Sequence, residues 1–421
     1  MKPLTTHFRP SRALLHPAVY LLAAGTFLMG TSEYVIAGLL PEIADDFHVP
    51  VPRAGLAITV FAIGIIIGSP ATALLTLRLP RRLALVVALV IFAIGHVVVA
   101  VSSDFTLLLA ARFVTATVTG AFWAIASVTA SRIVGPGASA RAIGVVLGGG
   151  MIANAIGVPL GSFAGQHIGW RGPFWALAMS ALLAAFATAR FVPADRSGTG
   201  PTPSVRSELS ALRSGRLWLA LAACVGITGG VLSVYSFISP LLTDRTKLAP
   251  SLVPVALVAF GIAAFIGSIV GGRLGGIRPY SAALVAAGIS LACSAGLAVF
   301  STHTVPTLLF FTTLGLSGFL ANPIMFVLVL RFSGTSPTLA TSLASSMFNV
   351  GIAVGTAIAA ATLNTGWEES GPPVVGVSAS ALVFVPLGVL AILDRGRCRG
   401  AAAHDSRSAR VNTRKDAPAN R

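Results

Sequence analysis

The chain has 421 residues, of which 55% are hydrophobic and 10% are charged, whereas about 25% are charged in an ordinary soluble domain. This composition excludes a soluble enzyme, and because the 44 glycines and 25 prolines are spread through apolar sequence, it also excludes a disordered or collagen-like chain. The net charge of +16 would suit a nucleic-acid-binding protein, so the positions of the basic residues have to decide between nucleic acid and membrane.

Apolar runs long enough to cross about 30 Å of hydrocarbon follow one another along the whole chain. There are twelve of them, covering residues 17–40, 54–77, 83–102, 105–128, 141–165, 173–192, 217–241, 251–272, 279–300, 305–330, 337–363 and 374–393. The first run follows basic residues, as a signal peptide would, but it is too long for a signal core and is interpreted as a retained helix. The sequence therefore predicts an all-α integral membrane protein with twelve transmembrane helices.

The distribution of Lys and Arg predicts the orientation in the membrane. With the N-terminus in the cytoplasm, 24 of the 29 basic residues fall on cytoplasmic segments, four on the opposite side, and the last, Arg112, within a span. The positive-inside rule thus predicts a multi-pass membrane protein with both termini cytoplasmic. We expect the membrane to be a bacterial inner or plasma membrane. The expected contact of the basic charge is the anionic cytoplasmic leaflet rather than nucleic acid.

A polar segment rich in Pro, Gly and Ser, residues 193–216, separates six predicted spans from six and is interpreted as a cytoplasmic linker. The expected division is a cytoplasmic N-terminal segment 1–16, a first six-helix bundle 17–192, the linker, a second six-helix bundle 217–393 and a basic cytoplasmic tail 394–421. The tail has too few large apolar residues to be expected to fold by itself.

Glycine pairs spaced by four residues recur on every third predicted span, which suggests an internal repeat. The positions are Gly64/Gly68, Gly157/Gly161/Gly165, Gly267/Gly271/Gly275 and Gly351/Gly355. In addition, Gly-Ser at 68–69 precedes Pro80 by the same offset as Gly-Ser at 267–268 precedes Pro279. We interpret the chain as two pseudo-symmetric halves of three plus three helices around a central path, although such pairs also serve simply to pack membrane helices.

Two permanently chargeable side chains, Glu33 and Arg112, lie well inside the predicted spans, where a lone charge costs several kcal/mol. Each lies seven residues from the predicted outer end of its helix, at a depth of roughly 10 Å, so the two are expected at one level. One interpretation is a static ion pair, or two side chains that reach separately toward the headgroups. The other is that Glu33 carries a coupled proton, because apolar surroundings favour its neutral form while Arg112 favours the carboxylate.

Helical spacing predicts which side chains surround a cavity near these two residues. The candidates are Thr26, Met29 and Tyr34 in the first span, Thr115, Thr119, Phe122 and Trp123 in the fourth, Tyr235 and Ser239 in the seventh, and Asn322 and Asn349 in the tenth and eleventh. Aromatic area with few hydroxyls and little fixed charge suits a neutral amphiphile. Phe122 and Trp123 fit lipid-facing or core positions equally well. The two asparagines also fit hydrogen bonding between helices, and His96 better fits a satisfied or interfacial histidine.

Energy for transport is expected to come from a gradient, because the sequence has no Gly-x-x-x-x-Gly-Lys-Ser/Thr loop for nucleotide phosphates. A membrane-embedded enzyme would need Asp, Glu or His clustered within the spans, and the sequence has no such cluster. The three scattered cysteines indicate neither a disulfide framework nor a thiolate metal site. We therefore expect no enzyme, no cofactor and no metal. A non-transporting receptor stays open as an alternative.

Several motifs carry a resemblance to a known family. They are GTSEYVIAGLLPEIADDF at 30–47, RLPRR at 78–82, Arg112 followed by GAFW from 120, GVPLG at 157–161, GWRGPF from 169, SFISPLL at 236–242, GGRL from 271 and FNVGIAVG from 348. Over all twelve spans the chain is similar to the twelve-span drug:proton antiporters of the major facilitator superfamily. The resemblance implies that the first, fourth, seventh and tenth helices line a cavity, with Glu33, Arg112, Tyr235 and Asn322 near substrate.

The same resemblance assigns further roles. It implies that the helix with Gly157, Pro159, Gly161 and Gly165 carries the antiporter motif and that Arg112 is the fourth-helix arginine associated with proton coupling. The loop after the second span departs from the family pattern, because Ala73 and Leu77 replace the usual Gly and Asp, and Gly276 replaces the acid in span eight. A candidate cytoplasmic gate is left with basic residues alone, namely Arg78, Arg81, Arg82 and Arg273.

The branch that the pattern resembles most contains chloramphenicol exporters and sugar or arabinose exporters. The resulting expectation is a monomeric transporter that exports a small neutral amphiphile, such as a phenicol antibiotic, in exchange for protons. Export of sugars or related metabolites is the alternative.

Overall fold

The structure, a computed structural model, describes residues 15–75, 80–135, 138–193, 213–333 and 337–394. Within these ranges the chain is helical and contains no strand. Twelve of its helices or helix groups are long and apolar enough to cross a membrane. The predicted all-α membrane fold with twelve spans is therefore confirmed.

The N-terminal half of the molecule, residues 15–193, contains the first six spans. Its helices are α1 (Pro17–Tyr34), η1 (Val35–Gly38), α2 (Leu40–Asp46), α3 (Val51–Ala54), α4 (Leu56–Leu75), α5 (Arg81–Val101), α6 (Phe105–Val134), α7 (Ser139–Ile152), η2 (Ala153–Gly157), α8 (Val158–Ile168) and α9 (Arg171–Phe191). Helices α7, η2 and α8 follow one another without interruption and together form the fifth span.

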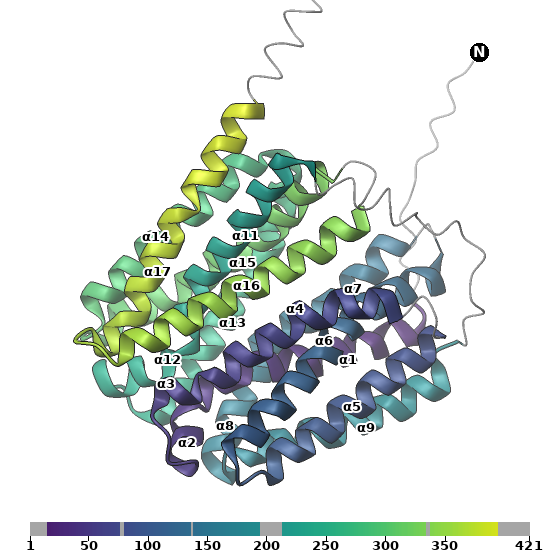
Figure 1. The fold of residues 1–421 in the computed structure, drawn as a ribbon, viewed down its shortest axis with the longest axis horizontal. Helices are drawn as coiled ribbons and strands as arrows, with labels where there is room; N and C mark the ends of the chain where they lie inside the picture. The colour runs from purple at the N-terminus through teal and green to yellow at the C-terminus, as the bar shows by residue number, and fades with distance from the viewer. Residues whose placement is uncertain (1–14, 76–79, 136–137, 194–212, 334–336, 395–421) are drawn as a thin grey trace, which may run out of the picture.

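The C-terminal half, residues 213–394, contains the other six spans. Its helices are α11 (Gly215–Ser236), α12 (Ile238–Pro240), η4 (Leu241–Arg245), η5 (Pro250–Leu252), α13 (Val253–Ile277), α14 (Pro279–Phe300), α15 (Thr304–Arg331), α16 (Pro337–Leu363), η6 (Glu368–Ser370) and α17 (Gly371–Leu382). The halves are separate groups of helices in Figure 1, with α4 and α16 side by side at their boundary.

The two halves repeat the same interhelical hydrogen bond. In the N-terminal half, the hydroxyl of Thr26 on α1 donates to the carbonyl of Val146 on α7 at 2.5 Å. In the C-terminal half, the hydroxyl of Thr228 on α11 donates to the carbonyl of Phe348 on α16 at 2.8 Å. Donor and acceptor are both displaced by 202 residues. The pseudo-symmetry of the halves therefore extends to individual contacts.

Glycines that let helices approach closely repeat as well. A Cβ atom on Gly64 or Gly68 would overlap α6, and one on Gly267 or Gly271 would overlap the backbone of α15. The contacts of Gly64 and Gly68 match those of Gly267 and Gly271 with an offset of 203 residues. Gly68 thus corresponds to Gly271. The correspondence expected from the two Gly-Ser pairs, which matched Gly68 with Gly267, is wrong by about one helical turn.

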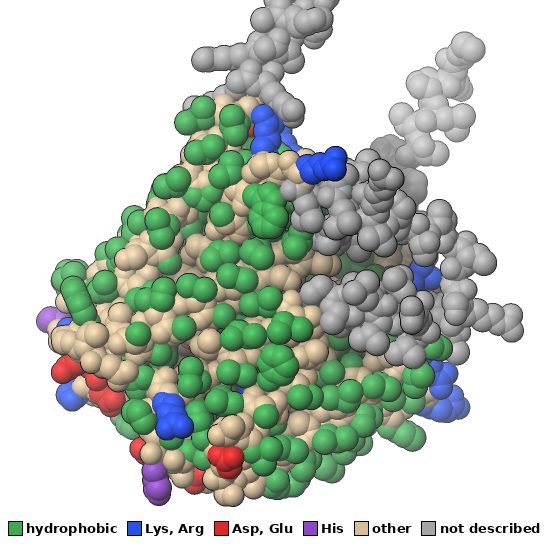
Figure 2. Space-filling view, viewed as in Figure 1, with side chains coloured by type: hydrophobic (Ala, Val, Ile, Leu, Met, Phe, Trp, Pro, Cys, Tyr) green, Lys and Arg blue, Asp and Glu red, His purple; other side chains and the backbone are tan. Residues whose placement is uncertain are grey.

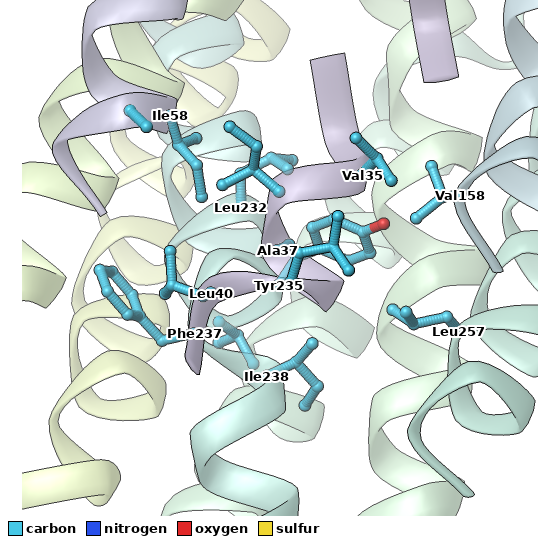
Figure 3. Packing of buried hydrophobic residues seen from close by; sticks show 14 of the residues in the cluster. Val35, Ala37, Leu40, Ile58, Val158, Leu232, Tyr235, Phe237, Ile238 and Leu257 are labelled. Atoms are coloured by element: carbon cyan, nitrogen blue, oxygen red, sulfur yellow. The ribbon is translucent and has the colours of Figure 1, made fainter. Parts of the chain in front are cut away.

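The buried apolar core shows where the two halves are held together. One cluster combines Val35, Leu40 and Ile58 of the N-terminal half with Phe237 and Leu257 of the C-terminal half, as Figure 3 shows. We call this end of the molecule the closed end. Away from it the core divides into one large cluster within each half and a small third cluster, formed by Phe61, Ile65 and Ala116, in the N-terminal half. The described parts of the halves therefore share an apolar core at the closed end and have separate cores at the opposite end.

The outer surface fits a membrane. Figure 2 shows hydrophobic side chains across the middle of the visible face, while Lys, Arg, Asp and Glu gather toward its two ends. Large apolar side chains such as Phe186, Leu183 and Ile392 are exposed. Exposure of this extent would be unfavourable in water but suits contact with lipid.

Candidate functional site

The local structure around Glu33 departs from a regular helix. Glu33 and Tyr34 end α1, and the next four residues form the 3-10 helix η1. Gly38 at its end permits a close approach of both halves, because a Cβ atom there would lie 2.9 Å from Ser162 on α8 and 2.9 Å from Leu257 on α13. The break therefore places the Glu33 segment where the two halves meet.

A small cavity lies beside Glu33 between the two halves. It is lined by Glu33, Tyr34, Ala37, Ile58, Phe61, Ala62, Leu232, Tyr235, Ser236, Asn349 and Ile352. Most of these side chains are apolar or aromatic. Two buried polar atoms of the lining residues, the Ser236 hydroxyl and the Asn349 Oδ1 atom, have no hydrogen-bond partner. The Nδ2 atom of Asn349 donates to the Ser345 carbonyl at 3.0 Å, so Oδ1 is left as a free acceptor.

Arg112 on α6 is fully buried near this cavity. Its Nη1 atom donates to the carbonyl oxygen of Ser32 at 3.0 Å and to the Ser32 hydroxyl at 2.9 Å. The guanidinium carbon lies 4.0 Å from the centre of the Phe61 ring, a distance that gives a favourable cation–π interaction. The Nε and Nη2 atoms of Arg112 have no hydrogen-bond partner. The arginine is thus anchored through one nitrogen, and its two other nitrogens are buried donors without a partner.

Glu33 lies beside Ser32, and the structure brings it to the level of Arg112. The side chain is half-buried on the cavity wall, and its carboxyl interacts with the Tyr34 hydroxyl and with the charge of Arg112. Arg112 is not among the lining residues, whereas Phe61, over which it is stacked, is one. The carboxyl is therefore the group of this pair that reaches the cavity.

A chain of aromatic rings extends from the cavity into the C-terminal half. The rings of Tyr34 and Tyr235 are 6.0 Å apart and nearly perpendicular, Tyr235 and Phe260 are 4.7 Å apart, and Phe260 and Phe311 are also 4.7 Å apart. By the 202-residue offset, Tyr235 is the counterpart of Glu33. The cavity is therefore asymmetric, because its N-terminal wall carries the Glu33 carboxyl and the corresponding position of its C-terminal wall is Tyr235.

Four of the candidates from the sequence lie together on the cavity wall, and the others lie elsewhere. Glu33, Tyr34, Tyr235 and Asn349 line the cavity. Thr26, Met29, Thr115, Thr119 and Phe122 are buried inside the N-terminal half. The three threonines of this group use their hydroxyls on backbone carbonyls, and the Phe122 ring fills the space beside Gly25.

Three further candidates also lie outside the lining residues. Trp123 is half-buried and packs on Gly150. Ser239 is buried in α12, where its carbonyl accepts from the Thr243 hydroxyl. Asn322 is half-buried on α15, and its Oδ1 atom has no partner. Sequence reasoning missed Phe61, Ser236 and Ile352 of the lining. Ser236 could have been found from the repeat, since it is the counterpart of Tyr34.

The glycines of the GVPLG helix pack against the segment that carries Glu33. A Cβ atom on each glycine would overlap one side chain of α1, of η1 or of the residue that follows η1, and the pairs are Gly157 with Thr31, Gly161 with Val35, and Gly165 with Leu39. Partners spaced by four residues on both elements produce a continuous close contact. The fifth span is therefore held directly against the Glu33 segment.

Pro159 explains the irregular turn in the middle of this span. A proline inside a helix has no N–H to donate and clashes with the carbonyl four residues earlier. Here the π-helix η2 ends two residues before Pro159, and the N–H of Val158 donates to the carbonyl of Ala153 instead. The buried Pro159 is thereby accommodated without breaking the span.

The basic residues of the predicted gate are only partly described. Arg78 lies outside the described residues. Arg81 and Arg82 begin α5 and are half-buried, and Arg273 on α13 is exposed. In the described ranges, no group of three or more His, Cys, Asp or Glu side chains is placed to hold a metal ion. The chemistry of the site is therefore carried by one carboxyl, one guanidinium and neutral polar groups.

Comparisons with known proteins agree in family. The model of the Major Facilitator Superfamily matches residues 22–356. A chloramphenicol resistance protein of Streptomyces lividans is 37% identical over 356 residues, which are 84% of this chain and 91% of that protein. The uncharacterized MFS-type transporter YtbD of Bacillus subtilis (strain 168) is 32% identical over 80% of this chain and 86% of its own.

Two further proteins are similar over most of their length. The inner membrane transport protein YdhP of Escherichia coli (strain K12) is 30% identical over 86% of this chain and 93% of its own. Among solved structures, a bacterial homologue of the human lysosomal transporter Spinster, in an inward-facing and occupied conformation, is similar with a TM-score of 0.72 and 15% identity. That similarity covers 90% of this chain and 96% of the other. It shows the shared fold.

Proposed function

Because the chain belongs to the major facilitator superfamily of membrane transporters, we propose that it exports a small neutral amphiphile in exchange for protons. The observation that carries the proposal is the position of Glu33, a carboxyl on the wall of the cavity with the Arg112 guanidinium beside it. Ionisable groups at membrane depth are costly and mark ion or substrate pathways.

The proton-coupling step follows from the unused donors of Arg112. In the described conformation the Nε and Nη2 atoms of Arg112 are unpaired, and the Glu33 carboxyl interacts with Tyr34. The unpaired nitrogens of Arg112 suit a neutral Glu33, because a carboxylate would be drawn to them. When Glu33 loses its proton, its carboxylate gains by moving to the free N–H groups of Arg112, since charge-assisted hydrogen bonds are the strong ones. Protonation therefore decides whether the two side chains pair.

The substrate class follows from the walls of the cavity. The rings of Phe61, Tyr34 and Tyr235 offer apolar area, and the Ser236 hydroxyl and Asn349 Oδ1 offer hydrogen bonds. A neutral molecule with an aromatic ring and hydroxyl or amide groups fits this set. Chloramphenicol is such a molecule, and a similar protein is named for resistance to it.

Alternating access requires that the halves separate at one end and join at the other. The halves share an apolar core at the closed end and have separate cores at the opposite end. With the termini in the cytoplasm, as the positive-inside rule favours, the closed end faces away from the cytoplasm. The described conformation then receives substrate from the cytoplasm of a cell bounded by an inner or plasma membrane.

The proposal is tested by expression in an efflux-deficient bacterial host. We expect lower chloramphenicol accumulation than in cells without the protein, and we expect a protonophore to abolish the difference. Glu33→Gln should abolish uphill export, whereas Glu368→Gln, which changes an exposed acid on η6, should not. Uphill export by Glu33→Gln that dissipates a pH gradient would refute the role of Glu33. Unchanged drug accumulation together with sugar efflux would replace the drug by a sugar.

A further inference from the structure

We propose that Ser32 and His96 are positioning residues for proton coupling, holding the Arg112 guanidinium so that its Nε and Nη2 atoms stay available to Glu33. The inference rests on the proposed function. Neither residue lines the cavity, and both are fully buried. They connect α1 and α5 to the arginine on α6.

Ser32, His96 and Arg112 lie within hydrogen-bond distance of one another or of a backbone carbonyl. The Ser32 hydroxyl lies 2.9 Å from Nη1 of Arg112 and 2.8 Å from Nε2 of His96. The other ring nitrogen of His96, Nδ1, lies 2.7 Å from the Phe92 carbonyl on the preceding turn of α5. The imidazole also packs on the rings of Phe92 and Phe174, which fix its plane.

The directions of these hydrogen bonds can be assigned from the chemistry of the groups. A carbonyl only accepts, so Nδ1 of His96 carries a hydrogen. An arginine only donates, so the Ser32 oxygen accepts from Nη1 of Arg112. The Ser32 hydrogen is then directed to Nε2, which accepts it as part of a neutral imidazole. In this arrangement every polar atom of Ser32 and His96 is used, and a cationic His96 would place a second positive charge beside Arg112.

The consequence for Arg112 is a fixed orientation. One nitrogen is tied to both the backbone and the side chain of Ser32, and the guanidinium lies on the Phe61 ring. Nε and Nη2 are left unpaired, and Glu33, the residue that follows Ser32, interacts with the charge of Arg112. Ser32 thus selects which face of the arginine reaches the carboxyl, and His96 holds Ser32 in the required rotamer.

The C-terminal half offers an internal comparison. By the offsets of the repeat, Val234 corresponds to Ser32 and Gly315 to Arg112. Neither side chain can form a hydrogen bond, and the Phe260 ring fills the space beside Gly315. The network is therefore confined to the half that carries Glu33, as expected if it serves that carboxyl rather than the packing common to both halves.

The test uses purified full-length protein in liposomes, with two transport assays of chloramphenicol. Uphill transport driven by a pH gradient requires proton coupling, whereas exchange of labelled for unlabelled drug requires only binding and alternation. The variants are Ser32→Ala, which removes the bridging hydroxyl, His96→Phe, which removes the acceptor, and His96→Gln, which can keep an acceptor. Ser317→Ala is the matched control, because Ser317 forms a buried 2.8 Å hydrogen bond with Ser290 in the other half.

We expect Ser32→Ala and His96→Phe to lower uphill transport by at least about tenfold, the effect of losing a hydrogen bond to a charged group. Drug exchange should stay within about twofold, as for substitutions with little energetic effect. His96→Gln should retain more uphill transport than His96→Phe. Ser317→Ala should change neither assay. Equal loss of exchange and uphill transport, or uphill transport unchanged in Ser32→Ala, overturns the positioning role. If Ser32→Ala does not fold, the comparison of His96→Phe with His96→Gln decides.

A second readout needs no substrate. The infrared band of the protonated Glu33 carboxyl, identified by its loss in Glu33→Gln, reports the surroundings of that group. Tyr34 on α1 and Arg112 on α6 are the ionisable groups that act on it, and Tyr235 on α11 lines the same cavity and acts on Tyr34. The band and its titration should shift in Ser32→Ala and in His96→Phe but not in Ser317→Ala. An unchanged band in both variants overturns the inference, whereas a wild type that moves no chloramphenicol refutes only the proposed function.

Discussion

Phe237 fills the seam between the two halves at the closed end, and its truncation should release that end. The side chain belongs to the C-terminal half and is 1% exposed. Its ring lies against the N-terminal half so closely that a Cβ atom on Gly55 would be 2.6 Å from its Cζ. Truncation of a buried Phe to Ala costs about 3–5 kcal/mol. Since this contact exists only while the closed end is shut, the cost should fall on that conformation.

The expected shift can be estimated. If about 3 kcal/mol acts on the closed state alone, the ratio of open to closed molecules rises roughly 100-fold, because each 1.4 kcal/mol is about tenfold. Leu40 reports this opening, since it is 0% exposed within the same cluster. In a background without the native cysteines, the alkylation rate of Leu40→Cys should follow the open population.

Alkylation is measured with purified protein in lipid nanodiscs, with and without Phe237→Ala. The control is Phe122→Ala, which removes an equally buried ring that packs on Gly25 within one half. The control should lower thermal stability but leave the alkylation rate within about twofold of wild type. A rate that does not change in Phe237→Ala, or that rises equally in both variants, would show that this ring does not hold the halves together.

Three further predictions concern the scaffold. Thr26→Val and Thr228→Val should each lower the free energy of unfolding in SDS titrations by about 1 kcal/mol and together by about 2 kcal/mol; strong non-additivity would contradict independent bonds in the two halves. Burial, together with a neighbouring carboxylate, raises the pKa of Glu42 on α2, so its stabilising contribution is present below the unfolded pKa and is lost as the pH rises through the folded one. Glu42→Gln should therefore match wild type in melting temperature near pH 4 and exceed it at pH 7, and equal melting curves at both values would contradict this. Gly261→Ala, whose Cβ would overlap the backbone of η2 in the other half, should slow transport, whereas Gly276→Ala, with open space around it, should not; equal rates in the two variants would exclude steric contact as the cause.

Much of the architecture could be predicted from the sequence, because membrane helices are recognised by the length and hydropathy of their apolar runs. The lengths of the apolar runs were enough to predict the twelve spans. The rise of a helix per residue was enough to predict that Glu33 and Arg112 lie at one depth. The cavity wall was harder to predict, because regular helical spacing from Glu33 points to Thr26 and Met29, which are buried among other helices. The lining residue after Tyr34 belongs instead to η1, where the geometry is 3-10.

Contacts between segments that are distant in the sequence could not be predicted either. The repeat was visible in glycine spacing, but its register was misjudged by a turn, since Gly-Ser pairs were matched without knowing which carbonyls the glycines face. The role of Ser32 was equally hidden. The sequence shows only that Ser32 precedes Glu33. Its role depends on the fold, because α5 and α6 place His96 and Arg112 within hydrogen-bond distance of its hydroxyl.

The unlike chemistry of the two cavity walls has a consequence for how this protein can change. In the proposed export cycle, substitutions around Tyr235 and Phe260 would alter the C-terminal side of the cavity and leave the Glu33 carboxyl in place. Substitution of Glu33 itself would remove the proposed proton coupling and leave the rings that offer apolar area to the substrate in place. Selection for a new substrate could therefore act on the C-terminal half while Glu33 and Arg112 in the N-terminal half stay unchanged.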